Sequence, residues 1–360
     1  MKQLNNTLAG LRGFLALSVV IYHIYGSAVL EKYITGFSED NILYAINYAG
    51  PISVNLFFVI SGYLILKSLT TKSSIWQFFV DRILRIYPVF LTIHILVFSI
   101  GPVIGYKWMD KIAITPYIVH FLTNLLLLPG MFNFPIAQIV AWSLSYEAIF
   151  YLIAGSLFFV WHKSIINSYL KYTFLILTTV ICILIFYFRP SALFFLVGVI
   201  VFLYESTMKR WFKPHKIFYL SGIIAFCLLY LSYDLQIFST AASLVLALLL
   251  FITIIAEYGL LSTILRLRLI RYLGRISYSL YMWHTMVMFP LKKLMGKISL
   301  YISNPSILLL IYAFITITLS IIVSHLSYTY IEIKLANRLR ALWYRDKRVK
   351  TASLHTKYPS

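Results

Sequence analysis

The first long apolar stretch of the sequence is LAGLRGFLALSVVIYHIYGSA, at residues 8–28. A helix of about 20 mostly apolar residues spans the hydrocarbon core of a bilayer, so this stretch predicts a transmembrane helix. It is too long for the apolar region of a signal peptide and lacks a small-residue cleavage site. Arg12 and His23 nevertheless lie inside it. Charged groups at membrane depth are costly, and they are therefore functional candidates from the start.

The composition extends this prediction to the whole chain of 360 residues, of which 61% are hydrophobic and 12% are charged. Soluble domains carry about 25% charged residues. The two cysteines, Cys182 and Cys227, lie in apolar runs and exclude a disulfide scaffold. The sequence therefore predicts an all-α, polytopic membrane bundle of about ten transmembrane helices. We expect these near residues 8–28, 50–68, 86–106, 139–161, 170–188, 190–204, 217–232, 238–256, 275–292 and 307–330. The stretch 115–134 is interrupted by proline and glycine and is predicted to be re-entrant or interfacial rather than an eleventh span.

The formal net charge of +20 first suggests a nucleic-acid partner. With ten spans and a cytoplasmic N-terminus, however, 24 of the 31 Lys and Arg residues fall on the cytoplasmic side. This is the positive-inside pattern, so we expect both termini in the cytoplasm and no nucleic-acid partner. The exception is the outer group of Lys292, Lys293 and Lys297. We expect one transmembrane domain over residues 1–333 and a basic cytoplasmic tail over 334–360.

Arg12 and His23 are 11 residues apart, which places them on one helix face about 16.5 Å apart along the axis. Glu147 is the one acidic residue clearly inside a predicted span, and we expect it at a depth similar to that of His23. A carboxylate beside an imidazole fixes its tautomer and stabilises the imidazolium, as in catalytic triads. The alternatives are a snorkelling arginine, a hydrogen-bonded core histidine and an ion pair that serves only packing.

Arg82 and Arg85 lie three residues apart before Tyr87-Pro88, on one face of a helix. Guanidinium groups suit phosphate oxygens, although ordinary positive-inside arginines explain the pair equally well. His94, His284 and His325 are interpreted as structural residues or cavity liners. The sequence lacks a His-Glu-x-x-His motif, and a metal site is not expected.

Five blocks of the sequence, in order, resemble the integral-membrane acyltransferase-3 family, which includes O-antigen, exopolysaccharide and Nod-factor O-acetylases. The blocks are LRGFLALSVVIYH (11–23), SVNLFFVISGYLI (53–65), FFVDRILRIYP (78–88), WSLSYEAIFY (142–151) and ISYSLYMWH (276–284). The resemblance covers roughly residues 8–333. It departs from the family pattern after the last predicted span, where Glu332-Ile333 is followed by Lys334 instead of proline.

The resemblance implies an acyltransferase with about ten spans that uses a cytoplasmic acyl-CoA, usually acetyl-CoA, as donor and binds no permanent cofactor. It implies that His23 is the catalytic base and that Arg12 belongs to the same motif. Arg82 and Arg85 match the motif associated with donor binding. Trp142, Ser143 and Glu147 match the WSL-type block, and we expect Glu147 to orient His23. Trp142, Ser143 and Tyr146 are the expected positioning groups for the acceptor or thioester.

The function expected from these residues is O-acetyl transfer from acetyl-CoA to a hydroxyl of a surface glycan or lipid-linked glycan, such as lipopolysaccharide O-antigen. The expected location is the bacterial inner membrane, with the bilayer as a further partner. The alternative is a transporter or flippase of a glycan intermediate in which His23 and Glu147 form a proton relay. Acetyl transfer by the purified protein separates the two.

Overall fold

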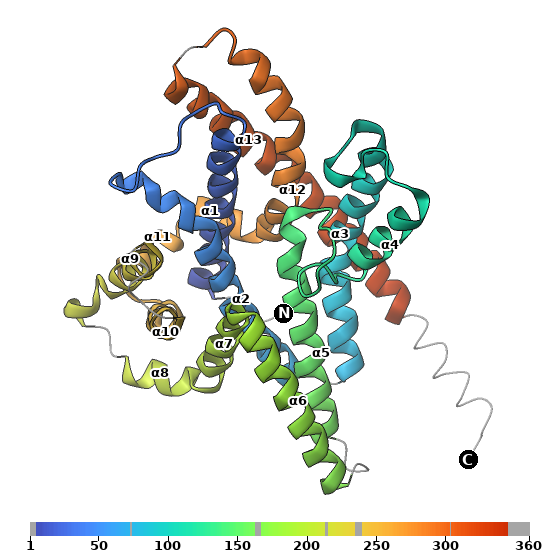
Figure 1. Ribbon diagram of the computed structural model, residues 1–360. Coiled ribbons are helices and arrows are strands. Elements are labelled where there is room, and N and C mark those ends of the chain that lie inside the picture. The colour runs from blue at the N-terminus through green and yellow to red at the C-terminus, as the bar shows by residue number, and fades with distance from the viewer. Residues whose placement is uncertain are drawn as a thin grey trace.

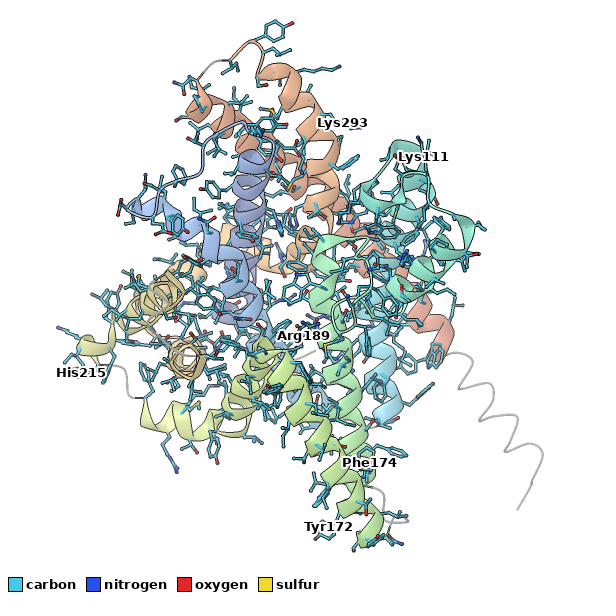
Figure 2. The ribbon with its side chains drawn as sticks, viewed as in Figure 1. Lys111, Tyr172, Phe174, Arg189, His215 and Lys293 are labelled. Atoms are coloured by element: carbon cyan, nitrogen blue, oxygen red, sulfur yellow. The ribbon has the colours of Figure 1, made fainter. Side chains whose placement is uncertain are left out.

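The computed structural model describes residues 5–72, 74–162, 167–212, 215–234, 240–302 and 304–344. In these ranges the chain is a bundle of helices without strands (Figure 1). Lys111 and Lys293 lie toward one end of the bundle, and Tyr172 lies at the opposite end (Figure 2). The prediction of an all-α helical bundle is confirmed. The α-helices are α1 (Asn6–Leu30), α2 (Ile46–Thr71), α3 (Ile75–Ile104), α4 (Ile114–Leu125), α5 (Trp142–His162), α6 (Ser168–Phe188), α7 (Leu193–Leu203), α8 (Glu205–Trp211), α9 (Ser221–Asp234), α10 (Thr240–Ala256), α11 (Gly259–Leu265), α12 (Arg268–Ile298) and α13 (Pro305–Ser327).

Seven helical segments in the described part of the chain are long and apolar enough to cross a membrane, and the bent pair α10 and α11 makes up to eight. The multi-pass membrane character is therefore confirmed. Two more predicted spans fall on helices outside this set: the shorter apolar helix Pro190–Leu203 and the more polar α12. In the stretch 115–134, α4 has 12 residues, which is too short for a span.

Two predicted boundaries differ from the structure. The span expected at 86–106 begins earlier, because α3 starts at Ile75 with Ser74 as its N-cap and therefore carries Arg82 and Arg85 within the helix. The tail expected at 334–360 does not begin at a break, because the last helix runs continuously from Pro305 to Tyr344. Its middle is a π-helix, η6 (Tyr328–Leu335), and residues 345–360 lie outside the described ranges.

Helices α1 and α12 run in the same direction and touch along their N-terminal halves through small residues. A Cβ atom added to Gly13 would lie 2.4 Å from the carbonyl oxygen of Ile270 and 2.5 Å from the nitrogen of Gly274. Likewise, a Cβ on Gly274 would lie 1.8 Å from the carbonyl oxygen of Ala9. Glycine at these positions lets the two backbones approach each other directly, as small residues do in membrane helix pairs.

We expect Gly13→Ala to separate α1 from α12 and to lower the stability of the protein by about 1–3 kcal/mol, the usual cost of overpacking. Gly26 is the matched control on the same helix, because a Cβ added there meets nothing within 4 Å. Gly26→Ala should leave stability unchanged or raise it slightly. Thermal unfolding of the detergent-solubilised variants measures both effects. Equal unfolding temperatures for the two variants would contradict the proposed close helix contact.

Candidate active site

A group of opposite charges lies inside the bundle, in the half that holds the start of α1. Arg12 interacts electrostatically with Arg85 of α3, Glu332 of η6 and Glu147 of α5. Four separate helices thus bring two guanidinium groups and two carboxylates together. Charges at this depth are tolerated because they neutralise one another. We call Arg12, Arg85, Glu147 and Glu332 the charged cluster.

Glu147 is held in the charged cluster by two hydroxyl groups. Ser61 of α2 donates a hydrogen bond of 3.1 Å from its Oγ to Oε1 of Glu147. Tyr151 lies one turn further along α5 and donates its phenolic hydrogen to the same oxygen. Two hydroxyl donors on the acceptor-only carboxylate keep Glu147 in place against the arginines.

Glu332 is a member of the charged cluster for which the sequence predicted no role. Its Oε2 accepts a hydrogen bond of 2.8 Å from Ser279 Oγ of α12, and its charge acts on Arg12 and Arg85. The carboxylate belongs to the π-helix η6. π-Helical turns are rare and occur frequently at functional sites. The missing proline after Ile333 therefore does not remove this carboxylate from the site.

The two arginines of the Arg-x-x-Arg pair have different surroundings. Arg82 is 9% exposed and lies over the rings of Phe78 and Tyr151, at 5.3 and 5.4 Å. Its Nη2 donates to the carbonyl oxygen of Leu64 at 3.4 Å. Arg85, by contrast, interacts electrostatically with Glu147, Glu332 and Tyr151. Arg85 therefore belongs to the charged cluster, whereas Arg82 packs beside it.

The expected pairing of Glu147 with His23 is wrong. Tyr22 on α1 packs against Gly50 of α2, which fixes the level at which these two helices meet. Ser61, the partner of Glu147, lies 11 residues further along α2, which corresponds to about 16.5 Å toward the level of Arg12. Hydrogen bonding to Ser61 and Tyr151 places the carboxylate closer to the level of Arg12 than to that of His23. The same observation removes the His23–Glu147 proton relay.

The neighbour of His23 is a second histidine. The rings of His23 and His284, on α12, lie with centroids 5.2 Å apart and planes inclined by 37°. Tyr22, the preceding residue on α1, also packs edge-on against His23, with ring centroids 5.0 Å apart. The charges that act on His23 are those of Lys107 and Lys292, both on the side away from the charged cluster.

Lys107 belongs to a short 3₁₀ turn, η2 (Lys107–Met109), between α3 and α4. Its Nζ donates to the carbonyl oxygen of Ala137 at 3.2 Å. Loss of hydration and the positive charge of Lys292 lower the pKa of Lys107 to about 8. Lys292 in turn pairs with Glu31 at 3.1 Å. A positively charged group thus borders His23 on this side.

The three residues expected to position the acceptor or thioester, Trp142, Ser143 and Tyr146, lie on the first turns of α5. Ser143 Oγ is 2.8 Å from the hydroxyl of Tyr281, whose ring is 6.3 Å from that of His284. Ser143 is therefore linked to the histidine pair through Tyr281. Trp142 and Tyr146 instead pack against each other and against Phe58 of α2.

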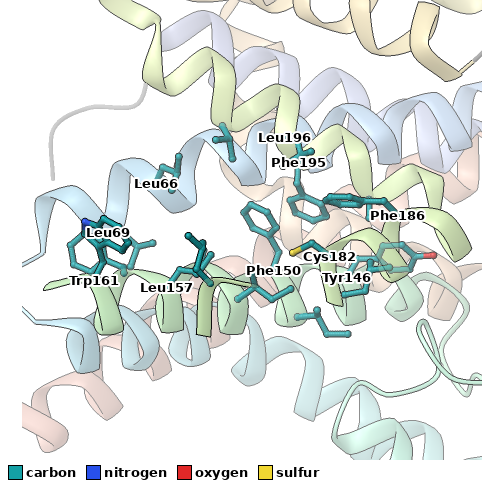
Figure 3. Close-up of a pocket in the computed structure, with 18 of the residues that line it drawn as sticks. Leu66, Leu69, Tyr146, Phe150, Leu157, Trp161, Cys182, Phe186, Phe195 and Leu196 are labelled. Atoms are coloured by element: carbon teal, nitrogen blue, oxygen red, sulfur yellow. The ribbon is translucent and has the colours of Figure 1, made fainter. Parts of the chain in front are cut away.

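Tyr146 also lines an apolar groove of about 510 Å³ between α5, α6 and α7. Figure 3 shows Trp161 and Leu69 near one end of this groove and Tyr146 and Phe186 near the other. Its walls are almost entirely apolar, with Cys182 among them. Tyr146 therefore contacts both the groove and the ring of Trp142.

Two other histidines match their structural interpretation. His94 is 3% exposed and lies among Phe90, Phe98 and Phe121, with ring centroids 4.6–5.6 Å away. His325 is hydrogen-bonded through Nδ1 to Tyr272, at 3.0 Å. Within the described residues, no group of three or more His, Cys, Asp or Glu side chains is arranged to hold a metal ion.

The arrangement thus combines a charged cluster toward the N-terminal end of α1 with a histidine pair further along the same helix. The family model described as an acyltransferase domain matches residues 5–325, nearly the whole chain. The chain belongs to the acyltransferase-3 family. As an acyltransferase it moves an acyl group between two substrates, and its helices place that reaction in a membrane.

Curated relatives agree with this assignment. The chain is 26% identical over 310 residues to ORF330 of Acidianus two-tailed virus, whose name provisionally assigns it as an acetyltransferase; the match covers 79% of this chain and 84% of that protein. It is 31% identical over 153 residues to the acyltransferase MdmB of Streptomyces mycarofaciens, covering 41% of this chain and 37% of MdmB. An uncharacterised protein of Haemophilus influenzae is 37% identical over 114 residues, covering 28% of this chain and 46% of that protein. No solved structure matches the chain.

Proposed function

We propose that this membrane acyltransferase is an O-acetyltransferase that uses cytoplasmic acetyl-CoA and acetylates a hydroxyl group of a surface glycan. The observation that supports the proposal is that an arginine of the charged cluster and a histidine lie at different levels of one helix. Arg12 lies in the charged cluster, and His23 lies 11 residues further along α1, about 16.5 Å away. An anionic donor that enters from the cytoplasm meets arginines first and an imidazole deeper in the bundle.

Coenzyme A is a polyanion with a long, extended arm that ends in the thioester. Arg85 and Arg12 are the proposed contacts for its phosphate groups, together with other basic residues of the cytoplasmic side. The carboxylates of Glu147 and Glu332 balance these arginines when the donor is absent. The pantetheine arm then extends along α1 toward His23, the group proposed to face the reacting atoms.

The proposed reaction is direct transfer. His23 takes the proton of the acceptor hydroxyl, whose oxygen attacks the carbonyl carbon of the thioester. The carbon–sulfur bond breaks, and the leaving thiolate of CoA takes the proton from His23. The new ester remains on the acceptor. Exclusion of water by the helical bundle limits hydrolysis of the thioester.

The acceptor proposed first is a surface or lipid-linked polysaccharide, such as lipopolysaccharide O-antigen, and the proposed location is the bacterial inner membrane. The direct experiment incubates the purified protein in liposomes with radiolabelled acetyl-CoA and a lipopolysaccharide extract. We expect acetyl groups in the glycan and free CoA in equal amounts. Comparison of glycan O-acetyl content in cells with and without the gene tests the acceptor. A protein that neither consumes acetyl-CoA nor changes glycan acetylation would contradict the proposal.

The different surroundings of Arg82 and Arg85 lead to a paired prediction. Arg85→Ala should raise the KM for acetyl-CoA about tenfold or more, because it removes a charge-assisted phosphate contact worth about 1.5–3 kcal/mol. Arg82→Ala should mainly lower the thermal stability, because it removes the cation that packs on Phe78 and Tyr151. Initial rates at varied acetyl-CoA, with unfolding temperatures for both variants, separate the effects. An unchanged KM in Arg85→Ala would remove Arg85 from the donor site.

A further inference from the structure

His284 is a fully buried histidine whose hydrogen bonding leaves one ring nitrogen unused. It is 0% exposed, and its Nδ1 lies 3.1 Å from the carbonyl oxygen of Leu280, one turn earlier on α12. A carbonyl oxygen only accepts hydrogen bonds, so Nδ1 is the donor. Nε2 of the neutral ring therefore carries a lone pair. This Nε2 is buried and has no hydrogen-bond partner.

A buried acceptor without a partner costs about 1–3 kcal/mol. His94 also has an unpartnered buried Nε2, but it lies among phenylalanine rings, whereas His284 has a second imidazole beside it. His23 is the neighbouring group that can use the lone pair, with its ring centroid 5.2 Å away. The orphaned nitrogen therefore points to a partner that forms its bond during the reaction. Catalytic hydrogen bonds are often long in the free enzyme and shorten in the reacting complex.

The helix packing holds the two histidines at a constant separation. Gly13 and Gly274 bring α1 and α12 into backbone contact, and His23 and His284 each lie ten residues further along these parallel helices. Tyr281, whose hydroxyl is hydrogen-bonded to Ser143, lies three residues before His284 on α12, with ring centroids 6.3 Å apart. His284 is thus fixed through Nδ1 by its own helix, and the ring of His23 lies 5.2 Å from its ring, centroid to centroid.

We propose that His284 is the positioning residue for His23, taking the orienting role that Glu147 does not occupy. The inference rests on the proposed function of His23 as the base. One nitrogen of His23 receives the proton of the acceptor hydroxyl, and the N–H on the other side of the ring donates to Nε2 of His284. The proton later leaves with the thiolate of CoA. His284 thus holds the imidazolium by a neutral acceptor and not by a carboxylate.

A neutral partner suits the surroundings of the histidine pair. The charged groups that act on His23 are Lys107 of η2 and Lys292 of α12, and both are cations. They disfavour a long-lived imidazolium, so His23 returns its proton readily. The hydrogen bond to His284 offsets the repulsion by these two lysines only while His23 carries the additional proton. A base that must alternate between two protonation states benefits from such a balance.

The test compares His284→Phe with His284→Gln in the purified full-length protein. Phenylalanine keeps the ring shape and removes both nitrogens, whereas glutamine places an amide oxygen close to the position of Nε2. We expect His284→Phe to unfold at the same or a higher temperature and to lose about 100-fold or more in kcat, with an unchanged KM for acetyl-CoA. His284→Gln should retain activity within about tenfold of the wild type. A phenylalanine variant as active as the wild type would overturn the inference.

A second measurement does not depend on turnover. Diethyl pyrocarbonate modifies neutral imidazole, and mass spectrometry follows its reaction with His23 between pH 5 and 8. In His284→Phe, protonated His23 loses its acceptor, so we expect the midpoint of this labelling curve to move to lower pH by about one unit. An unmoved midpoint would overturn the inference even if the wild type transfers acetyl groups. Loss of transfer in the wild type together with a moved midpoint would instead reject the proposed function and leave the histidine contact standing.

Discussion

Replacement of His23 by alanine is expected to abolish acyl transfer while the protein remains folded and membrane-inserted. General base catalysis contributes about 10²–10⁴-fold, and within the described residues the charges that act on His23 come from lysines and not from a carboxylate that could substitute. His23 is half-buried and makes no hydrogen bond that anchors the fold within the described residues, so the change should cost little stability. The measurement is acetyl incorporation into the glycan at matched protein abundance, with release of CoA as a second readout.

His325→Ala is the control for this experiment. His325 is exposed and is bonded to Tyr272, outside both the histidine pair and the charged cluster. It should transfer acetyl groups at the wild-type rate. Full activity of the His23→Ala variant would exclude His23 as the base. The alternative bases would then be Ser143 and Tyr281, whose hydroxyl groups are hydrogen-bonded to each other close to His284.

Removal of Glu332 is expected to be the most destabilising single change in the charged cluster. The carboxylate accepts from Ser279 and faces both Arg12 and Arg85, so Glu332→Ala leaves two guanidinium groups with Glu147 as the remaining acid of the cluster. The side chains of the charged cluster are half-buried and, in the described part of the chain, interact electrostatically without direct ion-pair contact. We therefore expect a cost below the value of about 3–5 kcal/mol for breaking a fully buried charge pair. We expect a lower unfolding temperature and loss of activity. Glu332→Gln keeps an acceptor for Ser279, and it should lose activity with a smaller loss of stability.

Glu31→Ala is the matched control for the effect of charge on stability. Glu31 is also paired with a cation, Lys292, but its side chain is 38% exposed. Surface ion pairs contribute about 0–1 kcal/mol. Its removal should therefore leave the unfolding temperature almost unchanged. If Glu332→Ala and Glu31→Ala unfold at the same temperature, the carboxylate of Glu332 does not stabilise the half-buried Arg12 and Arg85.

Much of the fold was predictable because each membrane span is determined by the residues of its own segment. Each range of about 20 apolar residues encodes its own helix, since backbone groups in hydrocarbon must be paired within the segment. The predictions were less accurate where apolarity is incomplete. Helix α12 carries serines, tyrosines and a histidine toward the interior, and α3 extends through Arg82 and Arg85 before its apolar part. Both deviations occur where polar residues serve the site.

The membership of the site was only partly predictable. Arg12, His23 and Glu147 were identified as charged groups inside apolar runs. Such residues can be recognised in the sequence without knowing which residues they contact. Glu332 gave no such signal, because it follows the last apolar run and is succeeded by a lysine. The continuation of the last helix through η6 brings it back into the bundle. His284 was noticed in the sequence, but nothing there distinguished an orphaned nitrogen from a satisfied one.

The sequence by itself determined that the chain is a polytopic helical membrane protein. It also determined which charged residues lie within the predicted membrane spans. These properties depend on the composition of single segments. Only the tertiary structure decided which groups face one another, because depth and rotation depend on how helices far apart in the chain pack. The contacts of Gly13 with Gly274 and of Tyr22 with Gly50 set those levels. They place Glu147 with Arg12 and leave His23 beside His284, a pairing that depends on the relative positions of α1 and α12.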